Sequence, residues 1–71
     1  MLIELKVWRD GQPDPLARGL DQLDGYLAGL RLDSGWLVLF DRRNGQPPIA
    51  ERTQVDETHS PGGRRIQVIR A

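Results

Sequence analysis

The sequence predicts an α/β fold in which a single βαβ unit is followed by a C-terminal β-hairpin. Three observations indicate this: a strand-like segment at residues 2–8, leucines at helical spacing after it, and a wholly apolar segment at residues 36–40. A strand, a helix and a second strand in this order form a right-handed crossover that makes the two strands parallel. We expect one domain, with this core in residues 1–43 and a loop and hairpin in residues 44–71.

The first predicted strand, LIELKVW at residues 2–8, carries two charges among its apolar residues. Side chains two apart on a strand point to the same face, so Glu4 and Lys6 should share one face. The ordinary explanations are an ion pair between them or an edge strand with one solvated face, where lysine discourages unwanted strand pairing. A polar turn at residues 9–11 should end the strand.

The predicted helix lies between residues 14 and 33. Asp14 is a favourable N-cap, and Pro15 suits the first helical position because no backbone N–H is needed there. Asp33, Ser34 and Gly35 should end the helix. Leucines at three- and four-residue steps predict one buried stripe, which consists of Leu16, Leu20, Leu23, Leu27 and Leu30.

The segment WLVLF at residues 36–40 is apolar without alternation, which is typical of a strand covered on both faces. Asn44-Gly45 and the two following prolines at 47 and 48 should lead the chain out of the sheet.

The C-terminal part, with two strand-like stretches around the turn HSPGG, predicts the hairpin. We expect Ile66 and Val68 to share a face with Thr53 and Val55 opposite them, and His59 to be an exposed turn residue.

Composition excludes several classes of protein. The 71 residues include ten basic and ten acidic residues, one histidine and no cysteine. Disulfides and thiolate zinc sites are therefore excluded, and the zero net charge argues against a non-specific nucleic-acid binder, which is usually basic. No apolar stretch approaches the roughly 20 residues of a membrane span, and signal-peptide features are lacking. We expect a cytoplasmic protein without membrane association.

Size predicts a partner. A chain of this length buries only about 60% of its unfolded surface, and small domains commonly compensate with a disulfide, a metal or a second subunit. Since disulfides are excluded and a metal site is disfavoured, a partner subunit or a missing remainder of the domain should compensate. The first strand would leave an exposed edge that recruits another chain, so we expect a homodimer.

Glu4-x-Lys6 on a strand, a helix with Gln22-x-x-x-Tyr26 and an apolar strand resemble the latter half of the PD-(D/E)XK nuclease core. Over residues 2–43 the chain resembles the nuclease-like domain at the C-terminus of certain prokaryotic AAA-type ATP-binding proteins. The resemblance implies a partial restriction-endonuclease-like fold, metal-dependent phosphodiester hydrolysis of nucleic acid, and an upstream ATPase domain in full-length relatives.

The same resemblance implies roles for individual residues. Glu4 and the backbone carbonyl of Leu5 would bind Mg²⁺ or Mn²⁺, which prefer oxygen ligands. Lys6 would orient the attacking water or stabilise the pentavalent phosphate. Gln22 would orient this catalytic network or touch the substrate backbone, so the implied catalytic residues are Glu4, Lys6 and Gln22.

Contacts with nucleic acid are a weaker implication. Arg18 and Tyr26 lie one helical turn on either side of Gln22 and could touch a substrate backbone, as could Arg42 and Arg43. Adjacent arginines are, however, more often a solvated surface.

The two tryptophans admit two roles. Trp8 and Trp36 could stack on bases, but we expect both to be buried against the helix.

One part of the family pattern has no counterpart. The principal metal ligand is usually an acidic residue on the strand before Glu-x-Lys, and only residues 1–3 precede the motif here. We therefore expect weak metal binding and no nuclease activity from this chain alone, so whether it is an enzyme stays open. The alternative is a non-catalytic, self-associating interaction module that retains the fold. A third hypothesis is a nucleic-acid-binding remnant.

Overall fold

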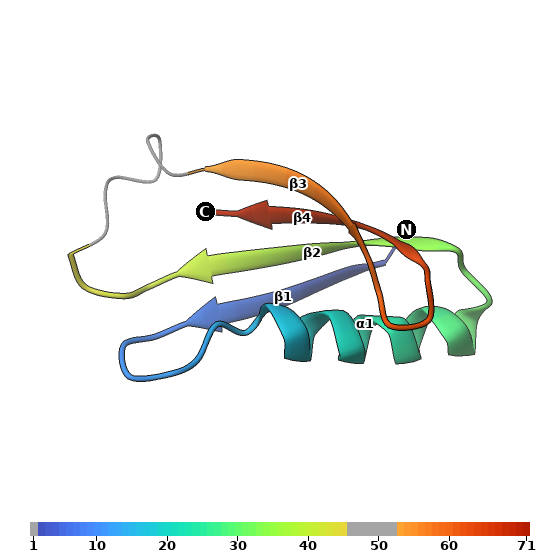
Figure 1. Ribbon diagram of the computed structural model, residues 1–71, viewed down its shortest axis with the longest axis horizontal. Coiled ribbons are helices and arrows are strands. Elements are labelled where there is room, and N and C mark those ends of the chain that lie inside the picture. The colour runs from blue at the N-terminus through green and yellow to red at the C-terminus, as the bar shows by residue number, and fades with distance from the viewer. Residues whose placement is uncertain (1, 46–52) are drawn as a thin grey trace.

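The computed structural model describes residues 2–45 and 53–71. The described part contains one helix and four strands: β1 (Ile3–Trp8), α1 (Leu16–Leu30), β2 (Ser34–Asp41), β3 (Gln54–His59) and β4 (Arg65–Arg70). The strand order is β1-β2-β4-β3, in which β1, β2 and β4 are parallel and β3 is antiparallel to β4 (Figure 1). The α/β class, the parallel βαβ unit and the C-terminal hairpin are therefore confirmed.

The start of α1 follows the capping residues of the sequence. Asp14 Oδ1 accepts a hydrogen bond from the backbone N–H of Leu16 at 2.9 Å. Pro15 has a φ of −77°, and its carbonyl accepts the first helical bond from Gly19 at 2.8 Å. Pro15 is therefore the N-cap, and the helix begins one residue later than predicted, at Leu16. The expected positions of Asp14 and Pro15 are wrong by one residue, although Asp14 still accepts a hydrogen bond from the first turn.

The end of α1 differs from the sequence expectation. The helix ends at Leu30 because Arg31 adopts a left-handed conformation, with φ 57° and ψ 39°. The N–H groups of Arg31 and Leu32 bond back to carbonyls of the last turn, which completes the helix end. The expected stop at residues 33–35 is wrong, since β2 already begins at Ser34.

The core lies between α1 and one face of the sheet. Six apolar side chains are at most 3% exposed: Leu23, Leu27, Leu37, Leu39, Ile66 and Val68. Leu16 and Leu20 pack against this core and are partly buried. Leu30 is 59% exposed, so its expected burial is wrong. The last turn of α1 extends past the start of β1 (Figure 1).

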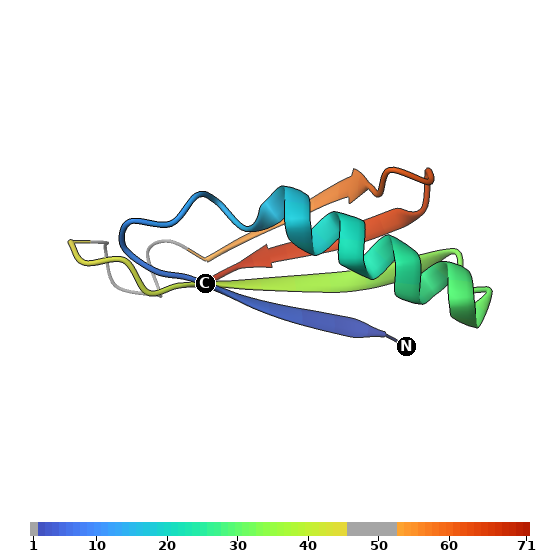
Figure 2. The same ribbon diagram turned by 90° about the horizontal axis from the view of Figure 1, so that it is seen from below.

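β2 is covered on one face only. Leu37 and Leu39 are buried under α1, whereas Trp36, Val38 and Phe40 on the opposite face are partly buried. The expectation of two covered faces is wrong for residues 2–45 and 53–71, because α1 covers one side of the sheet and no other described helix covers the second (Figure 2). The expected burial of Trp36 against the helix is wrong for the same reason.

We call the side of the sheet opposite α1 the open face. The register of the strands gives it the apolar residues Ile3, Leu5, Val7, Trp36, Val38, Phe40, Val55 and Ile69.

The hairpin has a different register from the expected one. Val55 lies opposite Ile69 on the open face, whereas Ile66 and Val68 lie beneath α1. The expected pairing of these two with Thr53 and Val55 is wrong, because β3 continues one residue into the predicted turn. A small shift of this kind exchanges the faces of a strand, since its side chains alternate.

Candidate functional site

Glu4 and Lys6 face α1 from β1. Their register partners on β2 are Leu37 and Leu39, which are buried beneath the helix. Both charged side chains are 21% exposed, and Lys6 Nζ lies 3.7 Å from Glu4 Oε1. The two residues therefore form an ion pair on an edge strand, the ordinary explanation of this motif. Such a partly exposed pair contributes about 0–1 kcal/mol but spares the protein two unpaired half-buried charges.

A pocket of about 270 Å³ lies beside Lys6, between β1 and the start of α1. The structure thus brings Lys6 and Arg18 together, two cations that are 12 positions apart in the sequence. Neither Glu4 nor Gln22 belongs to the described lining, which consists of Lys6, Val7, Gln12, Pro13, Asp14, Pro15 and Arg18.

Gln22 and Tyr26 lie on the flank of α1 that faces β1. Gly19 fixes this orientation, because a Cβ added to it would lie 3.4 Å from Lys6 Cγ and 2.9 Å from Leu37 Cδ1. At about 100° per residue, Gln22 and Tyr26 follow Gly19 on the same side. Gln22 is exposed and Tyr26 is 53% exposed, so both are open to solvent on that side of the helix.

The backbone of β1 has one free side. The carbonyl of Leu2 accepts a hydrogen bond from Trp36 N of β2 at 3.0 Å, and that of Trp8 accepts one from Arg42 N, just after β2, at 2.7 Å. Since backbone groups alternate along a strand, the N–H and C=O groups of Ile3, Leu5 and Val7 point away from the sheet. The same three side chains are 48%, 59% and 40% exposed on the open face. We call this combination of outward backbone groups and uncovered apolar side chains the free edge of β1.

The implied metal ligands are poorly placed with respect to each other. The Glu4 carboxylate lies on the helix side of β1 beside Lys6, whereas the Leu5 carbonyl belongs to the free edge. Within residues 2–45 and 53–71, no three His, Asp or Glu side chains are grouped as metal ligands. At the implied site, Mg²⁺ would therefore meet the single carboxylate of Glu4, which Lys6 already pairs with, and this donor set is a poor fit to a cation with about six oxygen ligands.

Arg43 is held in a cluster at the carboxyl ends of the parallel strands. Its guanidinium lies 3.5 Å from the centroid of the Trp8 ring, and Nε and Nη2 donate to the Asp41 carboxylate at 2.9 and 2.7 Å. Hydrogen bonding to Asp41 raises the pKa of Arg43. Trp8 Nε1 donates to the carbonyl of Gln12 at 2.8 Å. Trp8 therefore packs against an arginine, not against the helix as expected, whereas Arg42 is exposed.

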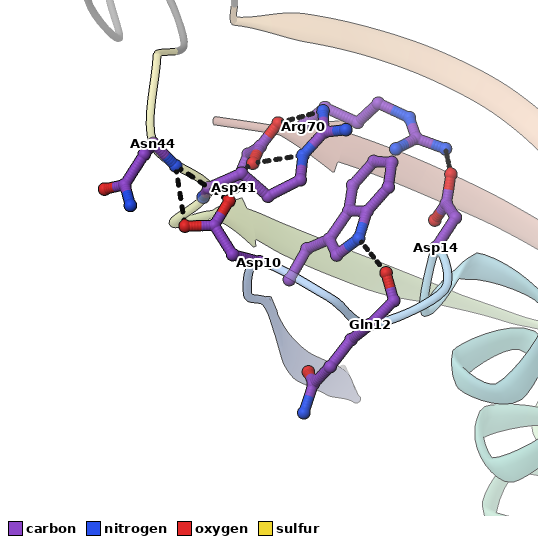
Figure 3. A network of polar contacts seen from close by, with 8 residues as sticks. Asp10, Gln12, Asp14, Asp41, Asn44 and Arg70 are labelled. Atoms are coloured by element: carbon purple, nitrogen blue, oxygen red, sulfur yellow. Dashed lines mark hydrogen bonds and ion pairs between the residues drawn. The ribbon is translucent and has the colours of Figure 1, made fainter.

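Two further contacts fix the same end of the sheet (Figure 3). The Asp10 carboxylate accepts hydrogen bonds from the backbone N–H of Asn44 at 3.1 and 3.2 Å. Asp14 Oδ2 accepts one from Arg70 Nη2 at 3.1 Å. The loop after β1 is thereby bound to the end of β2 and to β4. Sequence reasoning missed these contacts, because the partners are 34 and 56 positions apart.

A second cluster joins the β3–β4 turn to α1, and we call it the turn cluster. Asp24 Oδ1 accepts hydrogen bonds from Ser60 Oγ at 2.6 Å and from Arg64 Nη1 at 2.8 Å. Arg64 also donates from its backbone N–H to Ser60 Oγ and from Nε to the carbonyl of Leu32. The hydrogen bonds from Ser60 and Arg64 lower the pKa of Asp24. Ser60, which is only 5% exposed, has its buried hydroxyl fully used.

Comparisons with known proteins give no match, since no family model, curated protein or solved structure is similar to this chain. No helix in the described part of the chain has both the length and the apolar character needed to cross a bilayer.

Proposed function

We propose that this chain is a non-catalytic interaction module that associates with a second copy of itself through its sheet. The observation that supports this function is the free edge of β1, where Ile3, Leu5 and Val7 combine exposed apolar side chains with outward backbone groups. An edge of this kind is a template for pairing with another chain. Two-fold dimers are the commonest closed form of such association.

The small core supports the same proposal. Six fully buried apolar side chains hold a chain of 71 residues, and below about 70–80 residues a single core rarely supplies more than about 3–5 kcal/mol. Fully burying one Ile, Leu or Val side chain contributes about 1.5–3 kcal/mol. Covering three side chains that are about half exposed would therefore add a stabilisation comparable to that of the core itself.

The solution mass tests the proposal. We expect light scattering at micromolar concentration to give twice the chain mass of 8.0 kDa. Leu5→Glu should be monomeric, because it puts a charge at the centre of the free edge. Val55→Glu is the matched control, since Val55 is 61% exposed on the same open face but lies on β3. This control should remain dimeric, whereas a monomeric wild-type protein would rule out the module.

The nuclease-like function implied by the resemblance is the second candidate. The pocket shared by Lys6 and Arg18 favours it, because two cations beside a cavity suit a phosphate group. We expect no cleavage of plasmid DNA or RNA by this chain alone in millimolar Mg²⁺ or Mn²⁺, since one paired carboxylate is a weak metal site. Cleavage that Lys6→Ala abolishes would establish the enzyme instead.

A further inference from the structure

We infer that two copies pair through β1 as antiparallel strands with Leu5 on the two-fold axis, so that Glu4 of each copy lies opposite Lys6 of the other. This inference rests on the proposed self-association and specifies how the copies meet. Three features of β1 support it: which backbone groups point away from the sheet, the order of its charges, and its exposed apolar side chains.

The outward N–H and C=O groups of β1 fit this arrangement. Antiparallel strands alternate between pairs that exchange two hydrogen bonds and pairs that exchange none. The residues whose backbone groups point outward are Ile3, Leu5 and Val7. With Leu5 on the axis, Leu5 bonds Leu5 of the second copy, and Ile3 bonds Val7 of the second copy. Every outward N–H and C=O group between residues 3 and 7 therefore finds a partner.

The charges then fall opposite each other. Glu4 and Lys6 occupy the non-hydrogen-bonded positions, where facing Cβ atoms are about 4.5–5.5 Å apart. Both lie on the helix side of the strand and keep 21% of their side-chain surface exposed. The second copy would place Lys6 opposite Glu4 and Glu4 opposite Lys6, next to the existing intrachain pair. The result is a group of four charges in which opposite signs alternate.

The charges also select this register over its neighbours. The two neighbouring registers with the same faces are centred on Glu4 and on Lys6, and they would place Glu4 opposite Glu4 or Lys6 opposite Lys6. Like charges directly opposite each other are destabilising. Registers shifted by an odd number of residues would exchange the two faces of the strand. One ion pair can thus specify how two identical strands align, which gives a reason for charges on the most strand-like segment of the chain.

The apolar side chains agree with the same register. On the open face, Leu5 would meet Leu5 of the second copy, and Ile3 would meet Val7 of the second copy. These are three of the most exposed apolar residues in the described part of the chain. Their exposure arises because an edge strand lacks a neighbour, and the paired strand supplies one.

Cross-linking tests the register without changing a charge. The chain has no cysteine, so a single introduced cysteine can bridge only two copies. The two Cα atoms at position 5 should be about 5.5 Å apart, within the disulfide range of about 4.4–6.8 Å. Those at position 7 should be about 14 Å apart, given a rise of about 3.4 Å per residue. Leu5→Cys should therefore cross-link under mild oxidation and Val7→Cys only at background level. Equal yields, or a higher yield for Val7→Cys, would overturn the register.

Charge exchange gives an independent test. Glu4→Lys and Lys6→Glu should each raise the dimer dissociation constant about tenfold, which corresponds to about 1.4 kcal/mol. An equimolar mixture of the two variants should form heterodimers, because a strand with two lysines then faces a strand with two glutamates. Native mass spectrometry reads this when one variant is labelled with nitrogen-15, because the two chains otherwise have almost the same mass, and circular dichroism checks that each variant is folded.

The outcomes separate the two proposals. A dimeric wild type whose variants show no preference for heterodimers would overturn the register and leave the module intact. A monomeric wild type would overturn both. If a charge variant fails to fold, the comparison of the two cysteine variants still decides the register.

Discussion

The two edges of the sheet, β1 and β3, have equal lengths and opposite characters. Each strand has six residues, with the sequences IELKVW and QVDETH. Leu5 on β1 and Val55 on β3 are almost equally exposed, at 59% and 61%. Apolar exposure therefore does not distinguish the edges. Their charges do, because β1 carries one residue of each sign whereas β3 carries two adjacent acids.

The β3 edge is unsuited to pairing with a copy of itself. Ser60 N donates a hydrogen bond to the Arg64 carbonyl at 2.8 Å, so the backbone groups of Ser60 point toward β4. Because backbone groups alternate along a strand, those of the odd-numbered residues of β3 point away from the sheet. The two registers with the greatest overlap are centred on Asp56 and on Glu57, and each places a carboxylate opposite itself. The comparison teaches that the order of charges on an edge strand can decide whether the edge recruits a second copy or repels it.

Truncating a core side chain should have the largest effect on stability, because unfolding of the sheet would remove both edge strands. Leu27 is completely buried, and Leu27→Ala should lower the free energy of unfolding by about 2–5 kcal/mol. Leu30→Ala, on the same helix but 59% exposed, should change it by less than about 0.5 kcal/mol. Urea unfolding measures both. An unchanged midpoint for Leu27→Ala would show that α1 does not pack on the sheet.

Acid should weaken the β3 edge before the β1 edge. The pKa of Asp24 is lowered in the folded protein by hydrogen bonds from Ser60 and Arg64. Its carboxylate therefore stabilises the fold at neutral pH, and this contribution is lost below about pH 4, as the pH falls through the folded pKa. Protection of the β3–β4 amides, which is their exchange rate relative to the intrinsic rate at the same pH, should fall in this range more than protection of the β1 amides. In Asp24→Asn this acid-induced loss of protection should be reduced. An equal acid response in both proteins would contradict the assignment.

Neutralising the β3 edge should have the smallest effect on stability. Glu57 Oε1 lies 3.1 Å from Arg65 Nε, and the two side chains are 50% and 68% exposed. Glu57→Gln should therefore cost less than about 1 kcal/mol. The dimer mass should not change, because the Asp56 carboxylate would still repel that of a second copy at the β3 edge. Combining it with Asp56→Asn should produce assemblies larger than the dimer. Larger assemblies from Glu57→Gln alone would mean that the Glu57 carboxylate by itself prevents two copies from pairing through β3.

The local elements could be predicted from the sequence. The start of the helix next to Asp14, correct to within one residue, and the shared face of Glu4 and Lys6 follow from rules that act within a few residues. The parallel pairing of β1 and β2 follows from the handedness of crossovers. The partial exposure of the second face of β2 could not be predicted. The segment WLVLF indicates that both faces could be covered, but not whether the described part of the chain supplies a second helix to cover them.

The candidate site was only partly predictable. The placement of Gln22 and Tyr26 on one side of α1 follows from helical spacing. A cleft shared with Glu4 and Lys6 did not follow from it, since the described pocket beside Lys6 is lined by neither Gln22 nor Glu4. The turn cluster did not follow from any pattern, because Asp24 and Arg64 are 40 positions apart and meet only once the hairpin has folded. The clusters at both ends of the sheet depend on tertiary structure in this way, whereas the ion pair on β1 is local.

The placement of the two tryptophans gives the protein a pair of built-in optical probes. Trp8 is stacked under the Arg43 guanidinium, with its ring centroid 3.5 Å from Cζ, whereas Trp36 lies half-buried on the open face. The indole fluorescence of Trp8 should therefore report on the integrity of the carboxyl ends of the parallel strands. The emission of Trp36 should respond to any molecule that reaches the other side of the sheet. In single-tryptophan variants, the emission of Trp8 would thus report loss of folding, and the emission of Trp36 would report contact at the open face.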